Sequence, residues 1–397
     1  MNRTIEAPAT RHRFSPDFKR FLNWALVWVV LANIPFMAMW MVGAPPRAIP
    51  IALAGLVGLI VKRMPRALQW LAFLGVMVYS LLSFVSGLFS LTLDSLLYSL
   101  QFFAEIKPSN SIEYIAAAVV MFGILIGSWF LLKRDTNFSK PLHILLGGAL
   151  IFGLVGADAA VGEGMRGHYF RPAPAGAVFE SAVTKSGFAA RADGKRHLVL
   201  IIVESLGVPK NNKAMSDKLF AYYNSSAVKA RYEVSQGTSL YYNSTTSGEM
   251  RELCGRWGDY YELLNTDDPK TLNCLPAQLA EKGYATQAMH SFKGPFFKRE
   301  TWYPKIGFQK REFAADLEKR GAEWCGGVFA GACDRQVPKM LADNLKRAKQ
   351  PTFQYWLTLN THLPVPTEQN LHAENCEQVS VELARDYPMI CRQFAIF

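Results

Sequence analysis

The chain has 397 residues, half of them hydrophobic, and a formal net charge of +11. This length allows more than one domain. The apolar residues gather in long runs before about residue 160, whereas all six cysteines lie after it. Much of the positive charge sits on short loops between the apolar runs, where membrane topology explains it, so we do not expect a nucleic-acid partner.

Five apolar segments are predicted to cross a membrane. They cover about 21–42, 48–61, 67–91, 114–132 and 142–161, and most approach the ~20 residues that span ~30 Å of hydrocarbon. A cleaved signal peptide would explain only one of them. The tail 1–20 and the loops 62–66 and 133–140 are rich in Lys and Arg, which places the N-terminus in the cytoplasm. Five crossings then place the chain after residue 162 outside the membrane.

The cysteines agree with this topology. They stand at positions 254, 274, 325, 333, 376 and 391, all in the part assigned outside. An even number in an oxidising compartment predicts three disulfides, and we expect sequential neighbours to pair, although fifteen pairings are possible. A Cys-rich metal site is the alternative, but no CxxC or Cys/His pair has zinc spacing.

The remaining segments predict the domain order. Residues 94–114 are predicted as an amphipathic helix along the outer interface, or else as an ordinary ordered loop. Residues 162–195, rich in Gly, Ala and Pro, are predicted as a connector. From residue 196 to 397, buried strands ("LVLIIV", "YATQAM", "FQYWLTL") alternate with helical patterns. This alternation predicts an α/β domain with a mainly parallel sheet, the first strand being buried on both faces.

Three chemically useful side chains follow the predicted strands. Glu204 follows the first strand, His290 the second and His362 the third. Ligands bind beyond the carboxyl ends of such strands, so we expect the three to share one site. Each of the three residues taken alone also has an ordinary structural interpretation. Glu204 could be a solvated acid or a helix cap, and each histidine could simply be held by hydrogen bonds.

A threonine pair begins a predicted helix in "NSTTSGEMRELCG". One interpretation is a capping box, which Thr246 and Glu249 fit by spacing. Thr245 then stands just ahead of the helix, where the backbone N–H groups and the dipole favour a phosphoryl group. A divalent cation held by Glu204 could lower the pKa of the Thr245 hydroxyl and make it a nucleophile.

These motifs carry a family resemblance. "VES" at a strand end, together with "STTSGEMRELCG", resembles the outer domain of the lipoteichoic acid synthase and phosphoglycerol transferase group, in the alkaline phosphatase/sulfatase superfamily. The lipid A phosphoethanolamine transferases are similar, with five N-terminal spans and a metal-bound threonine. The resemblance implies that Thr245 is the nucleophile and that Glu204 and Thr245 ligate Mn²⁺ or Zn²⁺.

Two further segments are similar to the same group. "HSFKGPFFKRETWYPKIGF" resembles the stretch that holds the substrate headgroup, which implies this role for Phe297 and Arg299 and places His290 beside them. "LTLNTHLPVP" resembles the strand end whose histidine contacts phosphate, here His362. The alternative for Arg299 is a solvated cation in a basic run.

The chain departs from the group in one respect. The group's metal site also needs an Asp-His pair on a later strand, and this sequence contains no Asp-His dipeptide. We therefore expect a sequence cut short at its C-terminus, with an alkaline-phosphatase-like domain that is incomplete there.

The sequence therefore predicts an integral protein of a bacterial inner membrane with an outer phosphotransferase domain. It would move phosphoglycerol or phosphoethanolamine from a phospholipid to a glycan or lipid acceptor. The alternative is a non-catalytic or defective membrane protein of the same fold that binds phospholipid headgroups.

Overall fold

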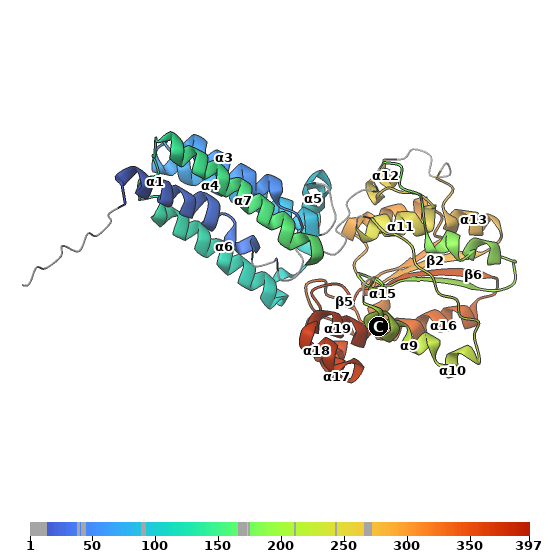
Figure 1. Ribbon diagram of the computed structural model, residues 1–397. Helices are drawn as coiled ribbons and strands as arrows, with labels where there is room; N and C mark the ends of the chain where they lie inside the picture. Colours follow the sequence, from blue (N-terminus) through green and yellow to red (C-terminus); the bar gives the residue numbers. More distant parts are fainter. Residues whose placement is uncertain are drawn as a thin grey trace, which may run out of the picture. The chain divides into compact units, whose positions relative to one another are not determined.

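The computed structural model describes residues 14–397 apart from 38–39, 41–44, 89–92, 166–172, 174, 210–211, 243 and 266–271. The chain forms two compact units, one made of residues 1–89 and 116–169 and the other of residues 90–115 and 170–397. Figure 1 labels their helices and strands in chain order. The segment between the third and fourth predicted spans thus belongs to the second unit.

The first unit is helical. Its elements are α1 (Pro16–Ala25), the π-helix η1 (Leu26–Leu31), α2 (Ile34–Met37), α3 (Ala48–Val61), α4 (Arg66–Leu88), α6 (Ile112–Leu131, whose first turn falls in the second unit) and α7 (Pro141–Met165). Trp24, Trp28 and Phe73 are buried in its core. Among the residues that the structure describes, three helical stretches are long and apolar enough to cross a membrane, namely Arg66–Gly87, Ile112–Leu131 and Pro141–Val161, while α3 is shorter. These apolar helices are consistent with a membrane bundle, although part of the first predicted span lies outside the described residues.

The second unit begins with α5 (Leu93–Ser99), η3 (Leu100–Glu105) and η4 (Pro108–Asn110). After α7 it continues through short helices into an α/β domain. Its main strands are β1 (Leu198–Ile202), β2 (Ala285–His290), β3 (Lys310–Glu312) and β6 (Thr352–Leu357), and β4 (Trp324–Cys325) pairs with β5 (Gly331–Ala332). Its helices are α8 (Ala182–Lys185), η5 (Phe188–Arg191), α9 (Lys213–Asn224), α10 (Ser226–Lys229), α11 (Thr245–Cys254), α12 (Tyr260–Leu264), α13 (Leu275–Glu281), η7 (Phe296–Lys298), α14 (Arg299–Lys305), α15 (Ala314–Lys319), η8 (Asp334–Gln336), α16 (Val337–Arg347), η9 (Gln369–Leu371), η10 (Ala373–Asn375), α17 (Cys376–Val379), α18 (Val381–Asp386) and α19 (Pro388–Ile396).

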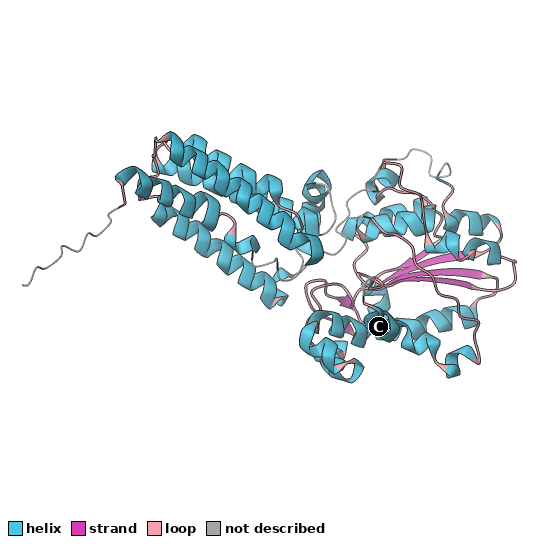
Figure 2. Ribbon diagram, in the orientation of Figure 1, coloured by secondary structure: helices cyan, strands magenta, loops and turns pink. Residues whose placement is uncertain are grey.

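The main sheet is parallel, as predicted. Its strand order is β1-β6-β2-β3, and each neighbouring pair runs parallel. Helices α11 and α13 lie on one face of the sheet and α9 and α16 on the other (Figures 1 and 2). The predicted α/β domain with a mainly parallel sheet is confirmed.

The first strand differs from its prediction. Strand β6 is buried along its whole length, whereas β1 leaves Val199 and Ile201 exposed by 38% and 45%. Within the described residues, β1 has a strand partner on one side only, β6. A continuous apolar run therefore marks a strand here without distinguishing a central strand from an edge strand.

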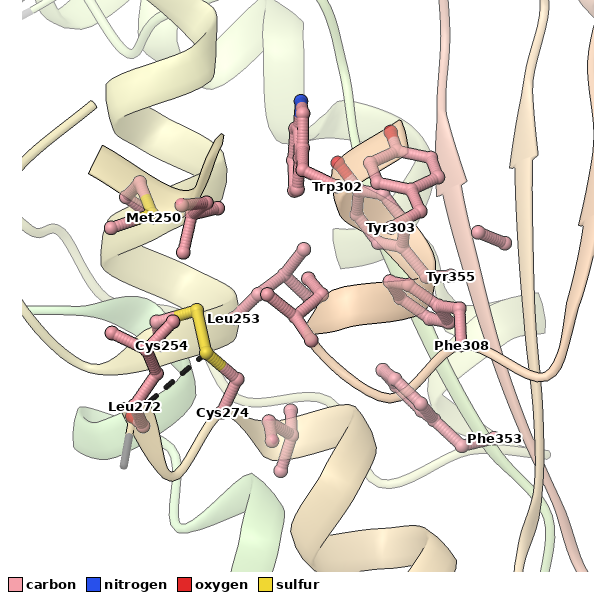
Figure 3. Packing of buried hydrophobic residues seen from close by; sticks show 14 of the residues in the cluster. Met250, Leu253, Cys254, Leu272, Cys274, Trp302, Tyr303, Phe308, Phe353 and Tyr355 are labelled. Atoms are coloured by element: carbon pink, nitrogen blue, oxygen red, sulfur yellow. Dashed lines mark hydrogen bonds between the residues drawn. A yellow bond between two sulfur atoms is a disulfide. The ribbon is translucent and has the colours of Figure 1, made fainter. Parts of the chain in front are cut away.

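The largest core packs α11, α13 and α14 against the sheet. Met250 and Leu253 of α11 face Trp302, Tyr303 and the aromatic residues of β6, as Figure 3 shows. The disulfide between Cys254 and Cys274 is part of this core. The other bridges join Cys325 to Cys333 and Cys376 to Cys391, so the pairing of sequential neighbours is the pairing in the structure.

Candidate active site

Glu204 stands two residues beyond the end of β1, and the neighbouring strand end holds its backbone. Its N–H donates to Thr358 Oγ1 at 2.9 Å, and its carbonyl oxygen accepts from Thr361 Oγ1 at 2.6 Å. Ser205 follows with φ of 52°, a left-handed conformation that turns the chain sharply. The loop after β6 thereby fixes the buried Glu204 carboxylate at the carboxyl edge of the sheet.

The Thr245 hydroxyl donates a hydrogen bond to Glu204 Oε1. Thr245 is the first residue of α11, and Ser244 occupies the N-cap without capping the helix through its side chain. Of the two interpretations of this segment, the capping box does not form: the helix begins at Thr245, and Glu249 points into the core instead of back to the N-cap. The fold thus brings together Glu204 and Thr245, which are forty-one positions apart in sequence and form the centre of the candidate site.

The neighbouring hydroxyls face another acid. Thr246 Oγ1 donates to Asp259 Oδ1 at 2.5 Å, and Ser247 Oγ donates to Asp259 Oδ2 at 3.2 Å. Asp259 also caps α12. Burial raises the pKa of Asp259, although the hydrogen bonds from Thr246 and from the Tyr260 backbone oppose this rise. Asp259 thus fixes the first turn of α11 in the orientation in which the Thr245 side chain points toward Glu204.

Arg299 lies at the start of α14, with its guanidinium buried against Glu249. Its Nε and Nη2 atoms lie 2.9 and 2.8 Å from Glu249 Oε2. The hydroxyls of Tyr303 and Tyr355 donate to Glu249 Oε1 at 2.6 and 2.9 Å. Burial alone would lower the pKa of Arg299, but the Glu249 carboxylate outweighs it and the pKa is raised. This buried network joins α11, α14 and β6 directly behind the site.

The other predicted site residues lie around the same sheet edge. His290 ends β2, and burial together with the Arg299 charge lowers its pKa well below the usual value, so it is neutral at pH 7. His362 lies beyond β6, with its ring 4.0 Å from that of Phe329. Burial lowers the pKa of His362, while the charge of Glu204 opposes the change. Phe297, with φ of 53°, contacts the rings of Phe296 and Tyr260.

Residues 196–385 match the family model described as Sulfatase. The matched part is just under half of the chain and is named the sulfatase domain after that model. The match confirms the superfamily that the "VES" and threonine motifs predicted. No curated protein matches the chain.

The chain is similar to several solved structures, among them the following two. One is a protein of the alkaline phosphatase superfamily from Vibrio parahaemolyticus, with 18% identity and a TM-score of 0.37, covering 51% of this chain and 49% of that one. The other is the lipoteichoic acid synthase LtaP from Listeria monocytogenes, with 18% identity and a TM-score of 0.34, covering 56% of this chain and 53% of that one. The chain thus spans about half the length of each.

The sulfatase domain offers a divalent metal two adjacent oxygen ligands, the Glu204 carboxylate and the Thr245 hydroxyl. Sulfatase-like enzymes generally use such a metal. Among the described residues, no group of three or more His, Cys, Asp or Glu side chains is placed to hold one. Catalytic zinc sites have three protein ligands. The described pair therefore fits part of a metal site, and it would hold the ion weakly by itself.

Sequence reasoning missed three acids of the sulfatase domain. Asp259 and Asp334 lie outside every motif, and the only role that the sequence suggested for Glu249 was in the alternative capping box. Asp334 Oδ2 accepts the N–H groups of Leu359 and Asn360 at 2.8 and 2.6 Å, and so orders the loop that leads to His362. The spacing of Thr246 and Glu249 was the only sequence signal for a partner of either residue, and it paired them with each other. In the structure Thr246 bonds to Asp259, and Glu249 bonds to Arg299 and Tyr303.

Proposed function

We propose that this chain is an integral membrane phosphotransferase. It would move a phosphoglycerol or phosphoethanolamine headgroup from a membrane phospholipid to a glycan or lipid acceptor. The observation that carries the proposal is the hydrogen bond from Thr245 to the buried Glu204 at the carboxyl edge of a sulfatase-family sheet. The long apolar helices of the first unit support a donor taken from a bilayer.

The proposed reaction has two displacements. The Thr245 oxygen attacks the phosphorus of the donor phosphodiester, the bond to the diacylglycerol oxygen breaks, and diacylglycerol leaves with a proton. An acceptor hydroxyl then attacks the phosphothreonine, and the Thr245 hydroxyl is restored with the proton of the acceptor. Glu204 and Thr245 would hold part of the coordination shell of a divalent metal, Mn²⁺ or Zn²⁺, which would acidify the Thr245 hydroxyl and neutralise phosphoryl charge when bound.

The environment of Thr245 suits a nucleophile better than that of Thr246. Thr245 is half-buried, and its hydroxyl points at Glu204, whereas Thr246 is fully buried and bonded to Asp259. Thr245 is also the first residue of α11, so an attacked phosphate would lie at the positive end of the helix. We assign the nucleophile to Thr245 on these two grounds.

Four residues are proposed to bind the substrate: His290, Phe297, Arg299 and His362. The headgroup role of Phe297 is supported by its place two residues before Arg299, at the start of α14. Arg299 is buried, and it donates to Glu249 through Nε and Nη2 and to the Phe296 carbonyl through Nη1 at 3.4 Å, so only the N–H groups left over from these contacts would bind a phosphate. Neutral His290 and His362 would donate or accept hydrogen bonds without adding charge.

The orientation of the chain is part of the proposal. The Lys- and Arg-rich tail and loops favour a cytoplasmic N-terminus, and the three disulfides favour an oxidising compartment for the sulfatase domain. Five crossings of a bacterial inner membrane would place the N-terminus in the cytoplasm and the sulfatase domain on the opposite side of the membrane.

The test is diacylglycerol release. The full chain is placed in vesicles containing phosphatidylglycerol and phosphatidylethanolamine with Mn²⁺ or Zn²⁺, and diacylglycerol is measured over time. Wild type and the surface control Gln350→Ala should release it, whereas Thr245→Ala and Glu204→Gln should not. Release at the wild-type rate by Thr245→Ala would contradict the proposal.

A second candidate is a non-catalytic protein that binds phospholipid headgroups. The two-ligand metal site within the described residues favours it. Wild-type protein that binds headgroup-bearing vesicles and releases no diacylglycerol with either metal would support this candidate.

A further inference from the structure

Residues 93–110 connect two membrane-length helices, yet they are built into the sulfatase-bearing unit. The ring centroid of Phe102 lies 5.8 Å from that of Phe296 and 5.6 Å from that of Phe297. Polar contacts fix the same segment further along: Glu105 pairs with Lys293 at 2.8 Å, and the Lys107 N–H donates to the Val328 carbonyl at 2.8 Å. The segment is therefore a fixed part of the domain.

The other side of this segment is apolar and exposed. Leu97, Leu100 and Phe103 are exposed by 47%, 47% and 59%, whereas Leu96 and Phe102 are buried. Residues 100–105 form a 3₁₀-helix, in which side chains three positions apart lie above one another. The spacing of three therefore places Leu100 and Phe103 in one row, with Leu97 one turn earlier.

The position of the segment in the chain identifies what this row faces. Helix α4 ends at residue 88, α5 begins at residue 93, η4 ends at residue 110 and α6 begins at residue 112. Both ends of the segment are thus joined by a few residues to helices that are long enough to cross a membrane, so the segment cannot move far from the bilayer surface. Residues 95–104 contain no Asp, Glu, Lys or Arg, which suits apolar insertion at the headgroup boundary instead of attraction to charged lipids.

We propose that Leu97, Leu100 and Phe103 lie in the lipid surface and that Phe102 fixes the Phe296–Phe297 pair beside it. The inference rests on the proposed function, because it adds how a lipid headgroup reaches the site. The aromatic contact would hold Phe297, a proposed headgroup residue, at the depth where donor headgroups lie. A donor would then enter from the bilayer without leaving it.

The first experiment measures depth and needs no activity. All six cysteines are in disulfides, so Leu100→Cys gives one thiol for a nitroxide label, with Gln350→Cys as the matched control in an exposed turn of the sulfatase domain. The full-length variants are placed in phosphatidylcholine vesicles, and the collision rates of each label with oxygen and with a water-soluble nickel chelate are measured.

For the label at residue 100, the ratio of the collision rate with oxygen to that with the nickel chelate should be several-fold higher than for the label at residue 350. Equal ratios would place Leu100 in water and overturn the proposal. Low access to both reagents would also overturn it, because the row would then be covered by protein, such as a second copy of the chain.

A second experiment links the row to the reaction. The triple variant Leu97→Gln/Leu100→Gln/Phe103→Gln should lose about tenfold in turnover of bilayer donor lipid, while a dispersed dihexanoyl donor is turned over within about twofold of wild type. Equal loss with both donors would contradict a role at the membrane. If wild type turns over neither donor, the proposed function fails, and the label measurement still decides the position of the row.

Discussion

Thr246 and Asp259 share a hydrogen bond of 2.5 Å between the threonine hydroxyl and Asp259 Oδ1, with both side chains buried. Thr245, one residue earlier, instead donates to Glu204. Two chemically identical neighbours therefore have separate partners, because successive residues of a helix point about 100° apart. Asp259 acts on Thr245 only indirectly, by fixing the first turn of the helix that carries it.

This separation predicts opposite effects for two alanine variants. Thr246→Ala removes one of the buried donors to Asp259 and leaves those of Ser247 and the Tyr260 N–H, so it should lower the free energy of unfolding by about 1–3 kcal/mol, while most of the diacylglycerol release remains. Thr245→Ala should abolish release and change thermal unfolding little. The reverse pattern in the two assays would move the nucleophile to Thr246.

The Glu249 network predicts a large stability effect. Glu249→Ala leaves the buried Arg299 unpaired and removes the acceptor of two tyrosines, so it should cost about 3–5 kcal/mol in thermal or denaturant unfolding. The matched control is Asp386→Ala, which breaks an exposed pair with Arg385 and should not shift the midpoint measurably. Equal shifts for the two variants would show that the buried network adds nothing.

Asp334 predicts a pH dependence. Burial raises its pKa to about 6 from an ordinary value of 3.8, against the hydrogen bonds that the carboxylate accepts. A raised pKa means that the stabilisation from this group is fully present below pH 3.8 and is lost as the pH rises through about 6. The two-unit difference corresponds to about 3 kcal/mol.

The pH dependence has a direct control in Asp334→Asn, which keeps an oxygen acceptor and cannot ionise. Its unfolding free energy, measured from pH 4 to pH 8, should fall less with rising pH than that of wild type. Parallel curves for the two proteins would mean that Asp334 does not titrate in this range.

The disulfides predict that unreduced protein contains no thiol that can be alkylated. Mass spectrometry should find the bridges 254–274, 325–333 and 376–391. Removing the first with Cys254→Ser/Cys274→Ser frees a loop of about twenty residues and should cost about 3 kcal/mol in unfolding free energy. Six free thiols in the native protein would contradict both the bridges and the outward topology.

The sequence predicted the parallel sheet and the shared edge of Glu204, His290 and His362, because strand patterns are local and parallel strands end at one edge. It did not predict that β1 exposes Val199 and Ile201, because a continuous apolar run looks the same in sequence whether the strand is central or at the edge of the sheet. The Asp259 and Glu249 partners were missed for a related reason. Each contact joins residues that are distant in sequence or separated by a loop, and only the packed helices bring them together.

The most direct test of the account is to locate the phosphorylated residue. Two samples of the protein are incubated without acceptor, one with phosphatidylglycerol and one with phosphatidylethanolamine. Each is digested with trypsin, which releases residues 232–251 as one peptide. Fragmentation between Thr245 and Thr246 distinguishes the two. The account predicts a phosphoglycerol or phosphoethanolamine mass on Thr245; the same mass on Thr246, or diacylglycerol release with neither threonine modified, would contradict it.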